Sequence, residues 1–204
     1  MTDQPLGPAR PTPPIEIVGG AADATARLGT SQVPVPDELI DDLRTICAVS
    51  VDEEVLTETS RDWWPLAMTW ALDGQVAARA SVVVTPTDAE QVAAVLARCN
   101  DARVPVTPTA GRSGVVGGAV PVHGGVIVDL CGLTGIRSVD STSLVVDVLP
   151  GTFGDHFEDE LQREHGLTVG HWPQSMALST VGGWLACRGA GQLSNRYGKI
   201  EDLV

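Results

Sequence analysis

The clearest pattern of hydrophobic and polar positions lies between residues 80 and 108. ASVVVTP (80–86) is a β-branched run that ends in proline, as a buried strand does. TDAEQVAAVLARCNDA (87–102) has helical spacing, and its Thr87 and Glu90 fit a capping box. The apolar stripe of this helix consists of Val92, Val95, Leu96 and Cys99. VPVTP (104–108) returns to strand spacing, so the stretch predicts a βαβ unit with parallel strands.

Weaker patterns surround this unit. Residues 36–47 (PDELIDDLRTIC) predict a short helix with acidic residues in its first turn. GVIVDL (125–130) and SLVVDVLP (143–150) predict strands, and residues 152–166 predict a helix that ends at a glycine. Residues before Pro36 are rich in Pro, Gly, Ala and Thr and lack apolar periodicity. We therefore expect a flexible Pro-rich leader over 1–36, a helical segment over 37–79 and one domain over 80–204.

A loop of small residues follows the second predicted strand. PTAGRSGVVGG (108–118) has four glycines, and glycine lets backbone N–H groups approach a ligand. The carboxyl end of a strand is where open α/β sheets hold ligands. The loop is neither a Rossmann fingerprint, since it does not open a helix after a first strand, nor a P-loop, since it lacks Gly-Lys-Ser/Thr. Local sequence leaves anion binding and a plain connection as equal alternatives.

The amino-acid composition argues against some classes of binding partner. The 204 residues are 43% hydrophobic and 19% charged, which is typical of a globular protein, and the net charge is −13. Because phosphate backbones and anionic membranes bind clustered Lys and Arg, we expect no nucleic-acid or membrane-surface partner. No apolar run reaches the ~18 residues of a membrane span, and the start lacks the pattern of a secretory signal. We expect four buried free cysteines and a cytoplasmic location.

Two groups of residues allow more than one interpretation. Trp63, Trp64 and Trp70 are favoured as core anchors over a surface for a partner. His156 and His165 lie among carboxylates nine residues apart, so a solvated acidic face is favoured over a metal site, and we expect no metal.

The last part of the chain, GHWPQSMALSTVGGWLACRGAGQLSNRYGKIEDLV (170–204), contains a second group of small residues. Ser179 and Thr180 precede Val181-Gly182-Gly183, which is typical of a helix start. Free N–H groups and the helix dipole would favour a phosphate at that point. Two such sites suit a diphosphate-bearing cofactor better than a single phosphate.

Taken together, the PTAGRSG loop and residues 170–204 resemble the FAD-binding domain of the vanillyl-alcohol-oxidase flavoprotein superfamily. The nearest likeness is to alkyldihydroxyacetonephosphate synthase and to FAD-linked oxidases of the glycolate oxidase and D-lactate dehydrogenase group. The resemblance covers about residues 60–204, and STVGGW and YGKIEDLV are its most specific parts. It implies an α+β fold, a two-subdomain FAD-binding domain of the vanillyl-alcohol-oxidase type that is incomplete at its C-terminus.

The resemblance also implies which residues bind the cofactor, FAD. The diphosphate loop matches Pro108, Thr109, Ala110, Gly111, Arg112, Ser113 and Gly114. A second segment that passes the flavin and diphosphate matches Gln174, Ser175, Met176, Ala177, Leu178, Ser179 and Thr180, and a third contact matches Cys187, Arg188, Gly189 and Ala190. His171 and Pro173 precede the second segment, where positioning is favoured over catalysis for His171.

Two departures from the family limit what it implies. Some relatives attach FAD through a histidine in an RSGGH-type loop, but Val115 and Val116 follow Gly114 here, so we expect noncovalent FAD. The chain stops at Val204, so we expect the substrate-binding domain and the catalytic residues to be absent from it. The function expected is that of an FAD-linked oxidoreductase, acting on a small hydroxy acid when complete.

Three alternatives stay open at this point. The complete protein is an oxidoreductase as above, or it carries out synthase-like exchange of an acyl for an alkyl chain in ether-lipid formation, or the chain is a truncated remnant or one half of a split flavoenzyme. We expect FAD and a small-molecule substrate as partners, and whether two copies form a homodimer is open.

Overall fold

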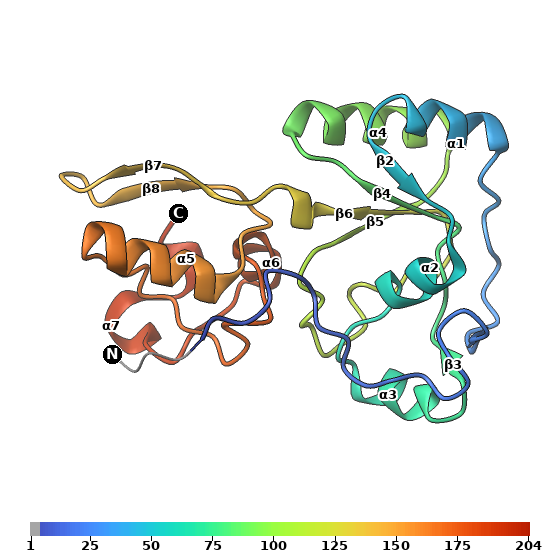
Figure 1. Ribbon diagram of the computed structural model, residues 1–204, viewed down its shortest axis with the longest axis horizontal. Coiled ribbons are helices and arrows are strands. Elements are labelled where there is room, and N and C mark those ends of the chain that lie inside the picture. Colours follow the sequence, from blue (N-terminus) through green and yellow to red (C-terminus); the bar gives the residue numbers. More distant parts are fainter. Residues whose placement is uncertain (1–4) are drawn as a thin grey trace. The chain divides into compact units, whose positions relative to one another are not determined.

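The computed structural model describes residues 5–204 (Figure 1), and the chain divides into two compact units. Pro13–Gly132 form what we call the sheet unit. Residues 133–204, together with residues 5–12, form what we call the hairpin unit. Each unit is described by itself below.

A four-stranded sheet in the order β2-β4-β6-β5 forms the centre of the sheet unit. β4 (Val82–Thr85) and β5 (Val106–Thr109) are the two strands of the predicted βαβ unit, and both run parallel to β6 (Val126–Asp129). The predicted parallel arrangement is confirmed, but β6 lies between β4 and β5. β2 (Ala48–Ser50) pairs antiparallel with β4 at the sheet edge.

Helices cover both faces of this sheet, because its central strands are apolar on both sides. α1 (Asp37–Arg44) and α4 (Ala89–Ala102) lie on one face, as Figure 1 shows, while α2 (Glu53–Thr59) lies on the other. The core on the α1 and α4 face includes Leu39, Leu43, Val82, Val84, Val95, Cys99, Val126 and Val128. On the α2 face it consists of Leu56, Ala80, Val83 and Ile127. Successive valines of β4 thus point to opposite cores.

The start of α4 differs by one residue from the prediction. Asp88, not Thr87, is the N-cap, and its carboxylate accepts a hydrogen bond from the Gln91 backbone N–H at 2.7 Å. The Gln91 side chain in turn accepts one from the Thr87 N–H at 2.9 Å. A related capping pattern forms with Asp88 and Gln91 in place of Thr87 and Glu90, but it is not fully reciprocal, because the Gln91 side chain accepts from the residue before the N-cap.

Part of the predicted leader is packed. Ile17 and Ala24 are buried with Ala71 and Val76, and β1 (Thr25–Ala26) pairs parallel with β3 (Gln75–Val76). These residues escaped the periodicity argument because the strand is two residues long and glycines and alanines surround it.

The tryptophans of the sheet unit lie against a small core. α3 (Pro65–Ala71) carries Trp70, whose ring meets that of Trp64 edge-on, with centroids 5.4 Å apart. Both pack against the buried cluster of Ala77, Ala78 and Val120. The favoured interpretation as core anchors is confirmed for Trp64 and Trp70, since both are partly buried against this cluster.

The hairpin unit is built around β7 (Ile136–Asp140) and β8 (Val145–Val148), an antiparallel pair. Its helices are α5 (Gly154–Glu160), which continues as a π-helical turn (Leu161–His165), α6 (Val181–Cys187) and α7 (Ser194–Tyr197). Short 3₁₀ turns occur at Leu130–Gly132 in the sheet unit and at Ile200–Asp202 in the hairpin unit. The hairpin unit's core consists of Phe157, Leu161, Met176, Val181, Trp184 and Ile200.

All four cysteines are free, as expected, but they differ in burial. Cys99 is buried, Cys47 and Cys131 are half-buried and Cys187 is exposed. The expectation of burial is therefore wrong for Cys187, which lies in the last turn of the short helix α6. Within residues 5–204, no helix has the length and apolar composition needed to cross a bilayer.

Candidate functional site

The glycine loop starts at the carboxyl end of the central sheet. Pro108 and Thr109 are the last two residues of β5, and the chain from Ala110 through Gly125 leads directly to the neighbouring strand β6. Arg112 has a φ of 53°, in the left-handed region that non-glycine residues seldom adopt. The structure thus places Ala110–Gly114 in a tightly turned segment at the position where open α/β sheets bind ligands.

The first half of the loop has unused hydrogen-bond donors. In the described part of the chain, the backbone N–H groups of residues 111–116 donate no hydrogen bond to any acceptor. A buried N–H without a partner is costly, so such groups are normally bonded to protein, water or a ligand. A succession of free N–H groups around a left-handed residue is an arrangement that binds anions.

Arg112 adds a positive charge to the loop. Its side chain is 13% exposed, and its Nη1 lies 3.7 Å from Asp129 Oδ2, too far for a hydrogen bond. Nη1 is buried and has no hydrogen-bond partner among residues 5–204. Burial lowers the pKa of the Arg112 guanidinium and nearby Asp129 opposes that change. An arginine stays charged in proteins, so its cation is only partly compensated and can pair with a further anion.

Two more polar groups lie near the end of β5. The Thr109 hydroxyl is buried and lacks a partner among the described residues. Cys131 follows Asp129, and burial raises the pKa of its thiol, with a further rise from the Asp129 carboxylate. The thiol is therefore protonated at neutral pH and is a poor nucleophile.

The second predicted segment, Gln174–Thr180, lies in the hairpin unit. Some of its polar groups are hydrogen-bonded within that unit. The Ser179 hydroxyl donates to the Ser175 carbonyl oxygen at 2.8 Å. It also accepts from the indole Nε1–H of Trp184 at 2.7 Å. Met176 belongs to the core of the unit, whereas Gln174 is exposed.

The start of α6 differs from the prediction of free N–H groups. Thr180 is the N-cap, as predicted, and accepts from the Gly183 N–H at 3.4 Å. The Val181 N–H donates to the Thr152 carbonyl at 3.0 Å, and the Gly182 N–H donates to the Pro150 carbonyl at 2.8 Å. The prediction of a phosphate site on these amides is therefore wrong, because a neighbouring segment already occupies them.

The third predicted segment, Cys187–Ala190, ends α6. Arg188 is its left-handed C-cap, with a φ of 51°, and its exposed guanidinium pairs with Glu201 at 2.9 and 3.1 Å. Gly189 and Ala190 carry no side-chain polarity, so this segment can offer a cofactor its backbone and the exposed thiol of Cys187.

His171 is one of the buried polar residues of the hairpin unit. Its side chain is 1% exposed, and neither ring nitrogen has a hydrogen-bond partner among the described residues. The ring lies 4.8 Å from that of Trp184, centroid to centroid, and Nε2 is 3.5 Å from where a Cβ on Gly189 would lie. Burial lowers the pKa of His171, so the imidazole is neutral at physiological pH. It has one donor and one acceptor to offer a ligand or a water.

Sequence reasoning missed two carboxylates of the sheet unit. Asp129 ends β6, and its place at the carboxyl end of a predicted strand was a signal that would have found it. Asp62, in the segment RDWW, is 1% exposed, and its Oδ2 has no hydrogen-bond partner among residues 5–204. No local pattern in the sequence marks this aspartate. The described residues contain no cluster of His, Cys, Asp or Glu able to hold a metal ion.

Comparison with known proteins places this geometry in a family. The family model of the FAD binding domain matches residues 80–204. D-lactate dehydrogenase of Anaerostipes hadrus is 35% identical over 127 residues, which are 62% of this chain and 26% of that protein. The chain spans 22% to 30% of the lengths of three such curated relatives, which include alkyldihydroxyacetonephosphate synthases of Dictyostelium discoideum and Trypanosoma brucei brucei.

Solved structures show the same fold. A crystal structure of alkyldihydroxyacetonephosphate synthase matches 98% of this chain and 36% of its own, with a TM-score of 0.79 and 24% identity. p-Cresol methylhydroxylase with bound substrate matches 78% of this chain and 31% of its own, with a TM-score of 0.65 and 23% identity. The predicted fold, an FAD-binding domain of the vanillyl-alcohol-oxidase type, is confirmed.

The chain belongs to the FAD-binding domain family of FAD-linked oxidoreductases, and its cofactor is FAD. The residues present fit that cofactor. The free amides of residues 111–116 and the unpaired Nη1 of Arg112 are donors that a diphosphate accepts.

Proposed function

We propose that FAD binds noncovalently to the three segments Pro108–Gly114, Gln174–Thr180 and Cys187–Ala190. The observation that carries this proposal is the glycine loop, where free backbone N–H groups adjoin a buried, incompletely paired arginine. In this assignment the diphosphate accepts hydrogen bonds from the loop amides and from Arg112. The other two segments contribute mainly backbone groups, because Ser179 and Arg188 already have partners.

The residues that come after Gly114 support noncovalent attachment. Val115 and Val116 are 58% and 81% exposed, and neither can form a bond to a flavin. Exposed valines instead offer apolar surface at the edge of the loop.

The reaction proposed for the whole protein is oxidation of a small hydroxy acid. Bound FAD supplies the ability to accept a hydride, and the chain's own residues bind and orient it. The 35% identity to a D-lactate dehydrogenase supports this substrate class. Ether-lipid synthase chemistry is the second candidate, supported by the structural match to alkyldihydroxyacetonephosphate synthase over 98% of the chain. Four free cysteines support a cytoplasmic location, and a homodimer stays a prediction.

The test uses two arginines that share a left-handed backbone. Arg112 and Arg103 have φ values of 53° and 56°, but Arg103 is an exposed C-cap of α4. Glycine at either position accepts the backbone without strain. We expect Arg112→Gly to weaken FAD binding about 10-fold or more, because a charged hydrogen bond contributes about 1.5–3 kcal/mol. Arg103→Gly should bind FAD as the wild type does.

The measurement is the flavin absorbance near ~450 nm that co-elutes with the protein on gel filtration, followed by titration of FAD. Loss of affinity in Arg112→Gly alone supports the assignment. Equal affinity in both variants contradicts the role of Arg112, and a wild-type chain that retains no flavin contradicts FAD binding by this polypeptide.

A further inference from the structure

A short segment outside the matched family range contacts the glycine loop at several points. We call Arg61–Trp64, which connect α2 to α3, the RDWW segment. The Trp63 backbone N–H donates to the Gly114 carbonyl at 2.8 Å. The Trp64 ring lies against Gly117, where a Cβ would come within 3.0 Å of ring atom Cε3 and the φ is 79°. Both halves of the loop therefore meet this segment.

Asp62 occupies the centre of these contacts. Its Oδ1 accepts a hydrogen bond from the Trp64 N–H at 3.1 Å. Its Oδ2 lies 3.4 Å from where a Cβ on Gly114 would be, and has no hydrogen-bond partner among residues 5–204. Burial raises the pKa of Asp62, and the backbone N–H groups of Trp64, Ala119, Gly117 and Gly118 oppose that rise. Oδ2 thus lies beside Gly114, with the amides of the second half of the loop near the carboxylate.

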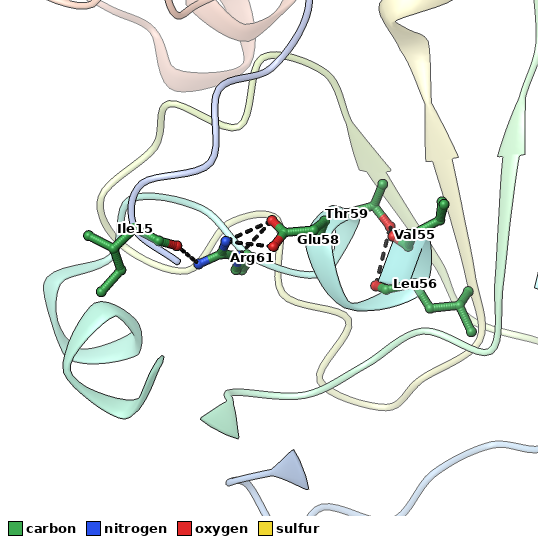
Figure 2. Close-up of polar contacts among 6 residues, drawn as sticks. All are labelled: Ile15, Val55, Leu56, Glu58, Thr59 and Arg61. Atoms are coloured by element: carbon green, nitrogen blue, oxygen red, sulfur yellow. Dashed lines mark hydrogen bonds and ion pairs between the residues drawn. The ribbon is translucent and has the colours of Figure 1, made fainter. Parts of the chain in front are cut away.

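The other end of the RDWW segment is fixed by Arg61. Figure 2 shows its guanidinium bound to both carboxylate oxygens of Glu58, at 2.7 to 2.9 Å, and to the Ile15 carbonyl oxygen at 2.7 Å. The Arg61 side chain is only 5% exposed. A guanidinium paired in this bidentate geometry restricts the conformational freedom of the backbone segment that carries it. The hydrogen bonds of Arg61 therefore hold the backbone next to Asp62 in place.

We propose that the RDWW segment is a brace for the cofactor loop, in which Asp62 is a positioning residue whose buried carboxylate lies beside Gly114 and attracts the amides of Gly117–Ala119, so that residues 111–116 are left to the diphosphate. This inference rests on the proposed function. A negative charge near the amides of Gly117–Ala119 disfavours an anion at those amides, so the proposal places the diphosphate on the preceding residues.

Energetics favour a functional reason for this carboxylate. Burying an ionised group costs free energy unless it is paired, and Asp62 is 1% exposed with one oxygen unbonded. The half-bonded carboxylate therefore lowers the stability of the fold. Groups that act on a ligand are often kept at the expense of stability.

The experiment compares Asp62→Asn with Asp73→Asn, which removes a charge from an exposed aspartate of the same unit. Affinities are measured for FAD, for ADP and for adenosine, which lacks the diphosphate. We expect Asp62→Asn to lower the affinity for FAD and ADP about 10-fold and to leave adenosine unchanged, since an amide NH₂ cannot accept from the loop. Its thermal midpoint should equal or exceed that of the wild type, because the buried charge is gone. Asp73→Asn should alter none of these values.

A second measurement covers the case in which ligands bind too weakly to compare. Hydrogen exchange of the Gly117–Ala119 amides in the ligand-free chain should be at least about 10-fold faster in Asp62→Asn than in the wild type, because the nearby negative charge is gone. Asp62→Glu, which keeps the charge but displaces the carboxylate, should also exchange faster.

The outcomes separate this inference from the proposed function. If the wild type binds FAD and Asp62→Asn binds FAD and ADP equally well, the brace is overturned while the FAD site stands. Unchanged exchange in both Asp62 variants also overturns it. If the wild type binds no FAD, the proposed function fails and exchange alone decides whether Asp62 shapes the loop. Equal losses for ADP and adenosine would mean general disruption, which contradicts a diphosphate-specific role.

Discussion

Two stretches of small residues in this chain look alike in sequence and differ in structure. Both the glycine loop and the start of α6 combine glycines with hydroxyl residues, and both suggested an anion site. In the glycine loop the N–H groups of residues 111–116 have no acceptor in the part of the chain that the structure describes. At α6 the N–H groups of Val181, Gly182 and Gly183 are all bonded within the hairpin unit.

The difference shows what small residues are for at each place. At α6 they allow close packing, because a Cβ on Gly182 would lie 2.7 Å from the Pro150 Cβ and 3.0 Å from its carbonyl oxygen. In the loop, Gly118 has nothing within 4 Å of a Cβ position, so space is not the reason for a glycine there. Small size serves packing at α6, whereas at Gly118 of the loop it leaves the backbone accessible.

Among substitutions that test this comparison, Ser179→Ala should have the largest effect on the free energy of unfolding. This change leaves the buried indole N–H of Trp184 without its acceptor, now at 2.7 Å, and we expect it to cost about 1–3 kcal/mol of unfolding free energy. Urea unfolding gives the value. In a Trp184→Phe background, where no N–H exists, the same substitution should cost less, and an equal cost in both backgrounds would refute the pairing argument.

A somewhat smaller effect is expected for Gly182→Ala. Overpacking against Pro150 costs about 1–3 kcal/mol, while the higher helix propensity of alanine returns about 1 kcal/mol. The thermal midpoint should fall. Gly118→Ala is the matched change in the glycine loop and should leave stability unchanged or slightly raised, since its position is open. A stable Gly182→Ala variant would mean that α6 has room for a ligand after all.

The smallest effect concerns His171 and appears only in acid. Because burial lowers its pKa in the folded state, the unfolded chain binds the proton more readily. Stability contributed by the neutral ring is thus lost as the pH falls below about 6.5, its value in unfolded chains. His171→Phe keeps an aromatic ring beside Trp184 and should flatten this part of the stability curve between pH 7 and 5. A variant curve parallel to that of the wild type would show that the ring is solvated.

Features of the site that depend on neighbouring residues could be predicted from the sequence, whereas features that depend on residues distant in sequence could not. The position of the glycine loop followed from the strand before it, and the start of α6 followed from Thr180. The occupation of the α6 amides could not be predicted, because their acceptors, Pro150 and Thr152, lie some thirty residues earlier in the chain. The proposed role of Asp62 could not be predicted either, because it depends on a loop that is distant in sequence.

The fold shows the same limit. β4, α4 and β6 were predictable because long apolar patterns dominate them. β7 has the sequence IRSVD, in which two polar residues interrupt a short strand, and its pairing with β8 comes from the tertiary fold. The insertion of β6 between β4 and β5 is also a matter of topology that periodicity does not contain.

That insertion bears on how this domain can change over evolutionary time. Adjacent parallel strands need a crossover, which is usually a helix, but β5 and β6 are joined through the glycine loop and residues up to Gly125. The ligand loop is itself the crossover, and both its ends are held by the register of the sheet. Since doubling the length of a loop costs only about 0.6 kcal/mol, insertions and substitutions can accumulate here while the sheet stays intact. Cofactor affinity can therefore diverge among descendants that share one unchanged scaffold.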